Sequence, residues 1–440
     1  MLLAGVALFG LLVSCARAAE PEAGALERYV AQPDDHFGWT QRREGTVGTV
    51  SWAELTLTSQ AWHDATWKHQ LYVLKPSKVR NPSHAVLVIG GGKWNDDLAK
   101  KTDDQQLPGQ AAAMVGVVEA LGSPVAVLLQ VPFQPLFDGM VEDQIISYTF
   151  AQFLQTGDDS WPLLLPMVKS AVRGMDAVEQ FAQRQWSLEI EHFTLTGASK
   201  RGWTTWLTSA VDPRVAALAP MVIDTLNMGA QIPHQLASWG RFSEQIHDYT
   251  ARGLQNFLFA SRGRELIGIV DPYQYRERIT QPKLIVLGTN DRYWPLDALN
   301  LYWKDLPGTK YVLYVPNQGH GIRDPERVLG TVAALHRQTM GELKLAAMSW
   351  KFDEEDKQVT LQIEADQKPM SVALWTAAMP TRDFRDAKWT SKPVDAAGEA
   401  YTASVELPST GFLALFGEAV FSTDRAPYHL STNVRIIAGQ

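Results

Sequence analysis

The sequence predicts an α/β fold, doubly wound around a mostly parallel sheet and followed by a smaller all-β domain. Continuous apolar runs, typical of strands that are buried on both faces, alternate with segments whose apolar residues recur at helical spacing. Helical periodicity then stops near residue 345, and short alternating runs follow. A length of 440 residues, with 45% hydrophobic and 20% charged residues, suits one large and one small globular domain rather than a disordered or fibrous chain.

The strands of the large domain are predicted in two groups. Apolar and polar residues alternate at 47–60 and 68–76, which predicts half-buried antiparallel strands. Continuous apolar runs predict buried strands at 84–90, 125–132, 193–197, 283–289 and 310–316, with 215–223 as a looser candidate. Helical patterns separate these strands at 110–121, 142–155, 166–184 and 325–345. Because strands that alternate with helices require crossover connections, the sheet is predicted to be mostly parallel.

Two segments depart from this alternation. Residues 228–280 form a long helical and aromatic-rich insertion between two strand candidates, which predicts a cap. Beyond residue 346, short alternating runs separated by turn residues predict an immunoglobulin-like β-sandwich. The predicted domains are therefore 30–345 for the α/β part, including its cap, and 346–440 for the sandwich.

The first 19 residues predict an export signal. The apolar run Leu2–Val13 has the length of a signal peptide and is too short to span a bilayer. It ends at Cys15 in a sequence that resembles a bacterial lipobox, whereas Ala16–Ala18 is an Ala-x-Ala site for ordinary signal peptidase. We expect an exported protein, periplasmic or secreted, that is either soluble or attached to a membrane through a lipidated Cys15.

The composition excludes several classes of protein. A net charge of −8 argues against nucleic-acid binding, which needs a basic surface. A single cysteine excludes an internal disulfide framework and a cysteine-based zinc site. His63 and His69 lack the spacing of metal ligands, and no cofactor motif is present. We therefore expect no metal, no cofactor and no nucleic-acid partner.

The sharpest motif is the stretch Gly197-Ala-Ser199-Lys-Arg201-Gly202, between a predicted strand and a helical segment. A serine in a tight turn between strand and helix is the arrangement of a nucleophile elbow, in which small neighbours let the backbone bend. The usual second glycine, two residues after the serine, is replaced by Arg201, and Gly202 follows one place later. A serine that caps the helix is the alternative interpretation.

A serine nucleophile needs a base that is oriented by an acid. Asp291 follows the predicted strand 283–289, and His320 follows the strand 310–316 between two glycines. Hydrolases of this architecture carry serine, acid and histidine in this order, each just beyond a strand. The sequence therefore predicts Ser199 as nucleophile, Asp291 as acid and His320 as base.

Two further aspartates are alternative candidates for the acid: Asp297, six residues after Asp291, and Asp224, just beyond the strand 215–223. An Asx turn is the alternative role for Asp291, since Asn-Asp sequences favour turns.

The chain resembles the PhoPQ-activated pathogenicity-related family of the α/β-hydrolase superfamily. The resemblance spans about residues 30–440 and rests on the stretches GASKRGWTTWLT, WGRFSEQIHDYTARGL, IVDPYQYRERI, GTNDRYWPLDALNLYWKDLPG and YVPNQGHG. It implies an α/β-hydrolase catalytic domain with a C-terminal β domain, and leaves the substrate open. The elbow alone also resembles that of glucuronoyl and acetylxylan-type esterases.

The oxyanion hole is predicted from backbone N–H groups of Lys200 and of the glycine loop after the strand 84–90, with Gly91 and Gly92 as donors. Candidate substrate-binding side chains near these loops are Trp94, Arg201, Trp239 and Trp294. Arg201 and Lys200 are able to contact a substrate carboxylate, although a structural ion pair is the commoner role for such residues.

The sequence thus predicts an exported, esterase-like serine hydrolase that cleaves an ester or amide of a small molecule or a peptide through an acyl-enzyme. One alternative is a dipeptidyl- or prolyl-type peptidase, for which Glu244 in the cap is half of an acidic pair that would hold a peptide amino terminus. The other is a non-catalytic secreted binding or signalling protein on a hydrolase scaffold.

Overall fold

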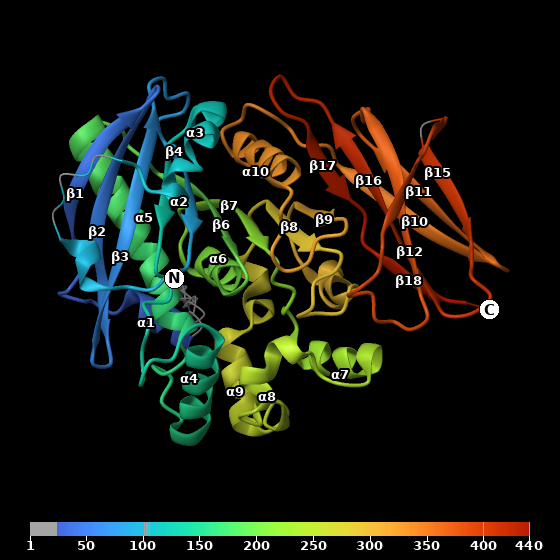
Figure 1. The fold of residues 1–440 in the computed structure, drawn as a ribbon, viewed down its shortest axis with the longest axis horizontal. Coiled ribbons are helices and arrows are strands. Elements are labelled where there is room, and N and C mark those ends of the chain that lie inside the picture. The colour runs from blue at the N-terminus through green and yellow to red at the C-terminus, as the bar shows by residue number, and fades with distance from the viewer. Residues whose placement is uncertain (1–23, 101, 103, 105, 399, 440) are drawn as a thin grey trace, which may run out of the picture.

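The computed structural model describes residues 24–100, 102, 104, 106–398 and 400–439 (Figure 1). The predicted signal and Cys15 lie outside these ranges, so export and lipid attachment remain predictions. Within the ranges, no helix is long and apolar enough to cross a membrane. The described strands form one nine-stranded sheet and two smaller sheets.

The large sheet has the strand order β1-β2-β3-β5-β4-β6-β7-β8-β9. Its strands are β1 (Gly38–Val47), β2 (Val50–Trp62), β3 (Ala65–Pro76), β4 (His84–Ile89), β5 (Val125–Leu128), β6 (His192–Ala198), β7 (Val215–Met221), β8 (Lys283–Gly288) and β9 (Lys310–Val315). The pairs from β5 to β9 are all parallel, whereas β1, β2 and β3 pair antiparallel and join at β5. The predicted mixed sheet with a parallel centre is confirmed.

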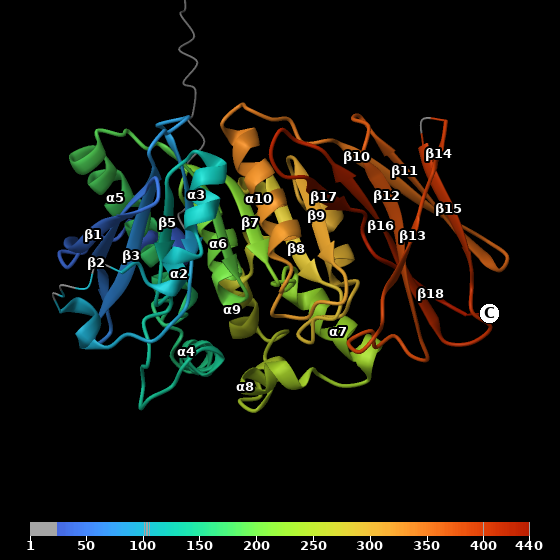
Figure 2. The ribbon, with the colours of Figure 1, turned by 45° about the horizontal axis from the view of Figure 1, so that its top comes forward.

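Helices flank the sheet and bury both of its faces (Figure 2). The helices are α1 (Ala25–Ala31), α5 (Leu164–Trp186) and α6 (Lys200–Val211) in one core, and α2 (Gly109–Ala112), α3 (Val115–Leu121) and α10 (Pro325–Thr339) in the others. Successive residues of a strand enter different cores: Leu87 packs with α5, and Val86 packs with α3. This burial on both faces is why the central strands read as continuous apolar runs.

The chain between β7 and β8 is helical, as expected for the segment 228–280. It contains α7 (Met228–Trp239), η2 (Glu244–Ile246), α8 (His247–Thr250), η3 (Leu254–Asn256), α9 (Ser261–Val270) and η4 (Pro272–Arg278). A helix from elsewhere, α4 (Asp143–Thr156), packs against α8 and α9. Short 3-10 turns also occur in connecting loops, namely η1 (Asp96–Ala99), η5 (Ala298–Leu301) and η6 (Trp303–Asp305).

The C-terminal part contains two all-antiparallel sheets that pack on each other. One holds β10 (Met348–Glu355), β11 (Gln358–Ala365), β14 (Ala396–Ala397) and β15 (Ala400–Glu406); the other holds β12 (Ser371–Met379), β13 (Thr390–Pro393), β16 (Phe412–Phe421), β17 (Tyr428–Ser431) and β18 (Arg435–Ala438). Ile363 of the first sheet and Leu415 of the second share one core. The all-β part is confirmed, while its immunoglobulin-like character and the domain boundaries remain predictions.

The C-terminal strands lie beside the β9 edge of the large sheet, where they are orange and red in Figure 1. The backbone N–H of Tyr314 in β9 donates to Ser431 Oγ of β17 at 3.0 Å. Residues of α10, β9 and both C-terminal sheets share one apolar core. The last parallel strand is therefore covered by the C-terminal part rather than left as an open edge.

Several predicted boundaries shift for local reasons. Strand β1 was not among the predicted runs because it is a polar edge strand, whose buried residue Arg43 pairs with Glu54. The helix predicted at 110–121 is divided into α2 and α3. The helix predicted at 325–345 ends at Thr339, and Gly341 follows with a φ of 74°.

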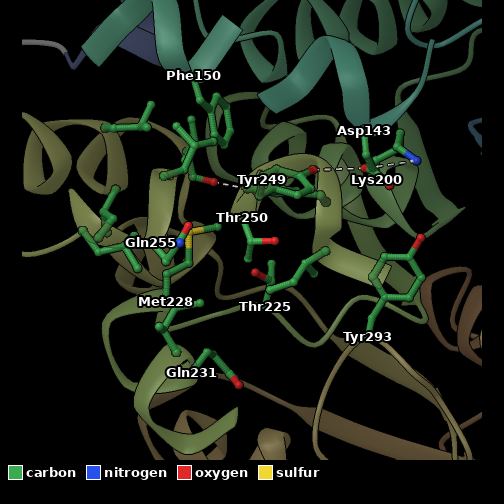
Figure 3. A pocket seen from close by; sticks show the side chains of 18 of the residues that line it. Asp143, Phe150, Lys200, Thr225, Met228, Gln231, Tyr249, Thr250, Gln255 and Tyr293 are labelled. Atoms are coloured by element: carbon green, nitrogen blue, oxygen red, sulfur yellow. Dashed lines mark hydrogen bonds and ion pairs between the residues drawn. The ribbon is translucent and has the colours of Figure 1, made fainter. Parts of the chain in front are cut away.

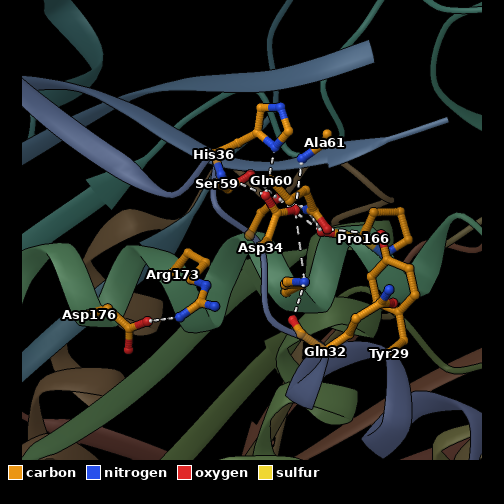
Figure 4. Close-up of polar contacts among 12 residues, drawn as sticks. Tyr29, Gln32, Asp34, His36, Ser59, Gln60, Ala61, Pro166, Arg173 and Asp176 are labelled. Carbon is orange, nitrogen blue, oxygen red and sulfur yellow. Dashed lines mark hydrogen bonds and ion pairs between the residues drawn. The ribbon is translucent and has the colours of Figure 1, made fainter. Parts of the chain in front are cut away.

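A buried polar cluster joins the N-terminal segment to α5 (Figure 4). Lys169, 3% exposed, donates from Nζ to Gln32 O at 2.8 Å and lies 4.0 Å from Asp34 Oδ2. Asp34 also accepts from the backbone N–H of Ala61 in β2 at 2.9 Å. Burial lowers the pKa of Lys169, and Asp34 opposes this shift. The cluster thereby holds the start of the chain, β2 and α5 together.

Candidate active site

Ser199 lies in a strained turn between β6 and α6. Its φ is 57° and its ψ is −129°, a backbone conformation that residues other than glycine rarely adopt. Ser199 occupies the N-cap position of α6, yet its side chain makes no capping hydrogen bond. Its Oγ lies instead 2.8 Å from Nε2 of His320. Helix capping therefore does not explain this serine.

Gly197 and Gly202 allow the strand and the helix to meet closely at this turn. A Cβ on Gly202 would lie 2.9 Å from the carbonyl oxygen of Gly197 and 3.0 Å from that of Met221. A Cβ on Gly197 would lie 2.7 Å from the carbonyl oxygen of Arg201. The glycine three residues after the serine therefore faces the backbones of β6 and β7, which explains the unusual spacing of the motif.

The structure brings Ser199, His320 and Asp291 into one hydrogen-bonded chain. Nδ1 of His320 lies 2.9 Å from Oδ2 of Asp291, while its Nε2 faces Ser199. The other oxygen of Asp291, Oδ1, accepts from the backbone N–H of Tyr293 at 2.8 Å. Asp291 therefore makes the Asx turn considered from the sequence and holds the histidine at the same time, with one oxygen for each.

Tyr293 is a residue of the site that the sequence analysis missed. Its ring lies against the imidazole of His320, with a centroid distance of 4.1 Å and an interplanar angle of 30°. Burial, with nearby Asp143 and Asp291, raises the pKa of Tyr293 to about 12, so its hydroxyl keeps its proton at neutral pH. The sequence does carry a signal for Tyr293: it stands two residues after Asp291, at the position whose backbone N–H bonds to the aspartate in an Asx turn.

The two alternative acids have other partners. Asp224 is buried and accepts from Tyr302 Oη at 2.6 Å. Asp297 lies 2.7 Å from Nε2 of His234 and 2.6 Å from Nη2 of Arg382. Asp291 is therefore the aspartate that contacts His320.

Both cations beside the serine are paired with Glu142. Arg201 donates from both terminal nitrogens to this carboxylate at 2.8 Å, and Lys200 Nζ lies 2.9 Å from it. Burial alone would raise the pKa of Glu142, but the hydrogen bonds and charge of Arg201, together with Lys200, lower it to about 2. Lys200 also lies 3.4 Å from Asp143. The commoner interpretation of these cations, a structural ion pair, matches this arrangement.

The glycine loop lies beside the elbow. The guanidinium of Arg201 occupies the space that a side chain at position 91 would need, and Gly92 has a φ of 123°. The N–H of Lys200 is the first of α6, where no acceptor exists within the helix. The backbone N–H groups of Gly91, Gly92 and Lys200 remain the predicted donors of the oxyanion hole.

The predicted tryptophans occupy different environments. Trp94 is 8% exposed and packs near Phe133, with ring centroids 6.4 Å apart. Trp239 lies beneath the guanidinium of Arg385, at 4.3 Å from the ring centroid. Of the four candidate substrate-binding residues, Trp294 lines the cavity beside Ser199, whereas Trp94, Arg201 and Trp239 are not among its lining residues.

This cavity has a volume of about 130 Å³ and is lined by Ser199 and by residues of α9, among others. Figure 3 shows further side chains of its lining, such as Phe150, Met228 and Tyr249. Its walls come from α4, α6, the segment after β7, and the helices α7 to α9. Ser199, Lys200, Tyr293 and His320 are also among its lining residues. No group of three or more His, Cys, Asp or Glu side chains that could hold a metal occurs in the described part of the chain.

A loop of the C-terminal part holds the acid and histidine loops in place. Asn290, next to Asp291, donates from Nδ2 to the carbonyl oxygen of Ala387 at 2.8 Å. Asn317, three residues before His320, donates to Trp389 O at 3.1 Å and accepts from Trp389 N at 2.9 Å. Sequence analysis found no signal for these contacts, because each joins residues far apart in the chain.

A serine at a strand–turn–helix elbow, with an acid and a histidine after later strands of a mostly parallel sheet, defines an α/β-hydrolase architecture. The model of the PhoPQ-activated pathogenicity-related protein family matches residues 26–385, and the chain belongs to this family.

Similar proteins include one characterised relative and several solved esterases. The chain is 32% identical over 383 residues to autocrine proliferation repressor protein A of Dictyostelium discoideum, covering 82% of this chain and 76% of that protein. Acetyl xylan esterase 1 from Thermoanaerobacterium sp. JW/SL YS485 is 15% identical, with a TM-score of 0.46 and coverage of 71% of this chain and 92% of the other. A glucuronoyl esterase from Solibacter usitatus is 12% identical, with a TM-score of 0.43 and coverage of 71% and 91%.

The packing at the elbow predicts opposite effects of alanine at two glycines. Gly202→Ala is expected to lower the free energy of unfolding by about 1–3 kcal/mol or more, because its Cβ presses on two carbonyl groups. The control is Gly268→Ala in α9, where a Cβ meets nothing and a gain of up to about 1 kcal/mol is expected. Urea denaturation followed by circular dichroism measures both. Equal stabilities of the two variants would contradict the packing argument.

Asp224 predicts a pH dependence of stability. Burial, with nearby Asp291 and Asp297, raises its pKa from 3.8 to about 7, so the folded protein keeps a proton that the unfolded chain releases. This stabilising contribution is complete below pH 3.8 and is lost as the pH rises to about 7. Asp224→Asn removes it.

The melting temperature of Asp224→Asn relative to wild type should therefore rise between pH 4 and pH 7 and then level off. Calorimetry at a series of pH values measures this difference. The control is Asp305→Asn, which removes an exposed carboxylate that also accepts a tyrosine hydroxyl. A difference for Asp224→Asn that stays constant over this range would count against the buried, protonated carboxyl.

The support of the histidine loop predicts the effect of removing one amide. Asn317 has a φ of 58°, so Asn317→Gly removes its two hydrogen bonds to Trp389 without forcing an unfavourable backbone. A loss of about 1–3 kcal/mol and faster hydrogen exchange near His320 are expected. Asp356→Gly, at an exposed turn with a φ of 45°, is the control. Unchanged exchange in Asn317→Gly would show that the loop does not need this support.

Proposed function

We propose that the protein is a serine hydrolase that cleaves carboxylic esters through an acyl-enzyme. The observation that carries the proposal is the hydrogen-bonded chain from Ser199 Oγ through both nitrogens of His320 to Asp291, with distances of 2.8 and 2.9 Å. Such a chain supplies a nucleophile, its base and the group that orients the base. A binding protein has no need of all three, or of a strained serine backbone between them.

In the first half of the reaction, Ser199 Oγ attacks the ester carbonyl and His320 Nε2 takes the hydroxyl proton. Asp291 Oδ2 accepts from Nδ1–H and stabilises the imidazolium that forms. The tetrahedral intermediate then collapses, His320 returns the proton to the leaving alcohol, and Ser199 keeps the acyl group. In the second half, water attacks the acyl-enzyme with His320 again as base, and releases the carboxylic acid and free Ser199.

The negative charge on the tetrahedral oxygen needs donors that are already in place. We assign the N–H of Lys200 as the first donor, because it begins α6 and the positive end of the helix dipole lies there. Gly91 and Gly92 are proposed for the second, since both lie on the loop after β4 and Gly91 faces Arg201 of the elbow.

The contacts of Glu244 disfavour the peptidase alternative. Arg385 Nη1 lies 2.8 Å from Glu244 Oε2, and Arg292 lies 3.6 Å from Oε1. A carboxylate that is already paired with two guanidinium groups is poorly placed to hold the amino terminus of a peptide. Ester cleavage therefore remains our first choice.

The second candidate function is a non-catalytic signalling role. It is favoured by the similarity to autocrine proliferation repressor protein A of Dictyostelium discoideum, whose name describes a repressor of proliferation. Under this alternative, a variant without Ser199 would keep the biological effect of the wild type.

Labelling with a fluorophosphonate probe tests the proposed hydrolase. Wild type should be labelled at Ser199, whereas Ser199→Ala should not be labelled. His320→Ala should be labelled at least about 100-fold more slowly than wild type, because the base is absent. The control is Ser187→Ala, which removes another serine of positive φ, 53°, and should leave labelling unchanged. A folded wild-type protein that the probe does not modify would refute the mechanism, and peptide mapping identifies the modified residue.

A further inference from the structure

The cavity beside Ser199 has a strongly apolar lining. Among its apolar side chains, Phe150, Trp203, Ile223, Leu254, Leu266 and Val270 are each at most 8% exposed. Phe257, which also lines the cavity, is 47% exposed. Burial of an apolar group in such a cavity is favourable because it removes apolar surface from water.

The charged groups of the lining are already neutralised. The charged lining residues are Lys200 and Asp143, which lie 3.4 Å apart. Lys200 is also paired with Glu142, and Asp143 accepts from Tyr249 Oη at 3.0 Å (Figure 3). The remaining polar lining consists of uncharged amide and hydroxyl groups. A charged substrate group would therefore lose its hydration without gaining an ionic partner.

The size of the cavity limits what it accepts. A volume of about 130 Å³ is slightly below that of an apolar cavity of about 150 Å³ that admits benzene. A linear or branched group of about four to six carbons therefore fills it. A chain much longer than this exceeds the volume of the cavity.

We propose that the substrate is an uncharged ester, one arm of which is an apolar group of about four to six carbons that lies in this cavity. The inference rests on the proposed serine hydrolase function and adds the substrate class. The carbonyl carbon lies at Ser199, and the apolar arm extends between Trp203 of α6 and Leu266 of α9, both of which line the cavity.

A series of 4-nitrophenyl esters tests the proposal, with acetate, butyrate, hexanoate, dodecanoate and the negatively charged hemiglutarate as acyl groups. Acetate esters of ethanol, butanol and hexanol test the other arm in the same way. In one of the two series, kcat/KM should rise about fourfold per added methylene up to about six carbons. If the acyl series shows this rise, kcat/KM should fall for dodecanoate, and the hemiglutarate should react at least tenfold more slowly than hexanoate.

Two neighbouring residues of α9 provide a matched pair of variants. Leu266 and Ile269 are 7% and 9% exposed, but only Leu266 lines the cavity. Leu266→Ala should move the optimum to chains longer than in wild type, whereas Ile269→Ala should keep the wild-type optimum. Leu266→Trp should favour acetate by shortening the cavity, and circular dichroism checks that each variant folds.

The outcomes separate this inference from the proposed function. If Ser199 is labelled and acetate esters react, but neither series depends on chain length, the cavity does not hold a substrate arm and the inference fails alone. A preference for the charged hemiglutarate, or an equal shift of optimum in Ile269→Ala, overturns it as well. If wild type is neither labelled nor active on any ester, the hydrolase function fails, and the substrate class with it.

Discussion

The turn at Ser199 is the constraint on which the surrounding structure depends. A serine at a φ of 57° persists only where its neighbours fix the backbone. The N–H of Ser199 donates to Met221 O of β7 at 2.8 Å, and its carbonyl accepts from Trp203 N of α6 at 3.0 Å. These bonds tie the turn to a strand on one side and a helix on the other. The close approach also requires glycine at 197 and 202, so the sequence around the serine has little freedom.

Ser199 has paired charges on one side and an apolar cavity on the other. Glu142 and Asp143 together balance the charges of Lys200 and Arg201, the two cations that follow the serine. The cavity on the other side of Ser199 is lined mostly by apolar side chains, so a bound group meets no unpaired charge there.

The sequence allowed the central strands and the three residues after them to be predicted, because both leave local signals. Burial on both faces produces continuous apolar runs, and Ser199, Asp291 and His320 follow the ends of β6, β8 and β9 by one, three and five residues. The contacts of Glu142 with Arg201 cross 59 residues, and neither residue belongs to a pattern that names the other. The edge strand β1 was missed for a different reason, since a strand that is half exposed needs few apolar residues.

The support of the site by the C-terminal part has a consequence for the order in which the molecule is completed. A chain is synthesised from its N-terminus, so Ser199, Asp291 and His320 all leave the ribosome before the loop that carries Ala387 and Trp389. The hydrogen bonds of Asn290 and Asn317 to that loop span 97 and 72 residues. A nascent chain that ends near residue 380 thus holds every chemical group of the triad, while the loops that carry its acid and its histidine have yet to gain their partners.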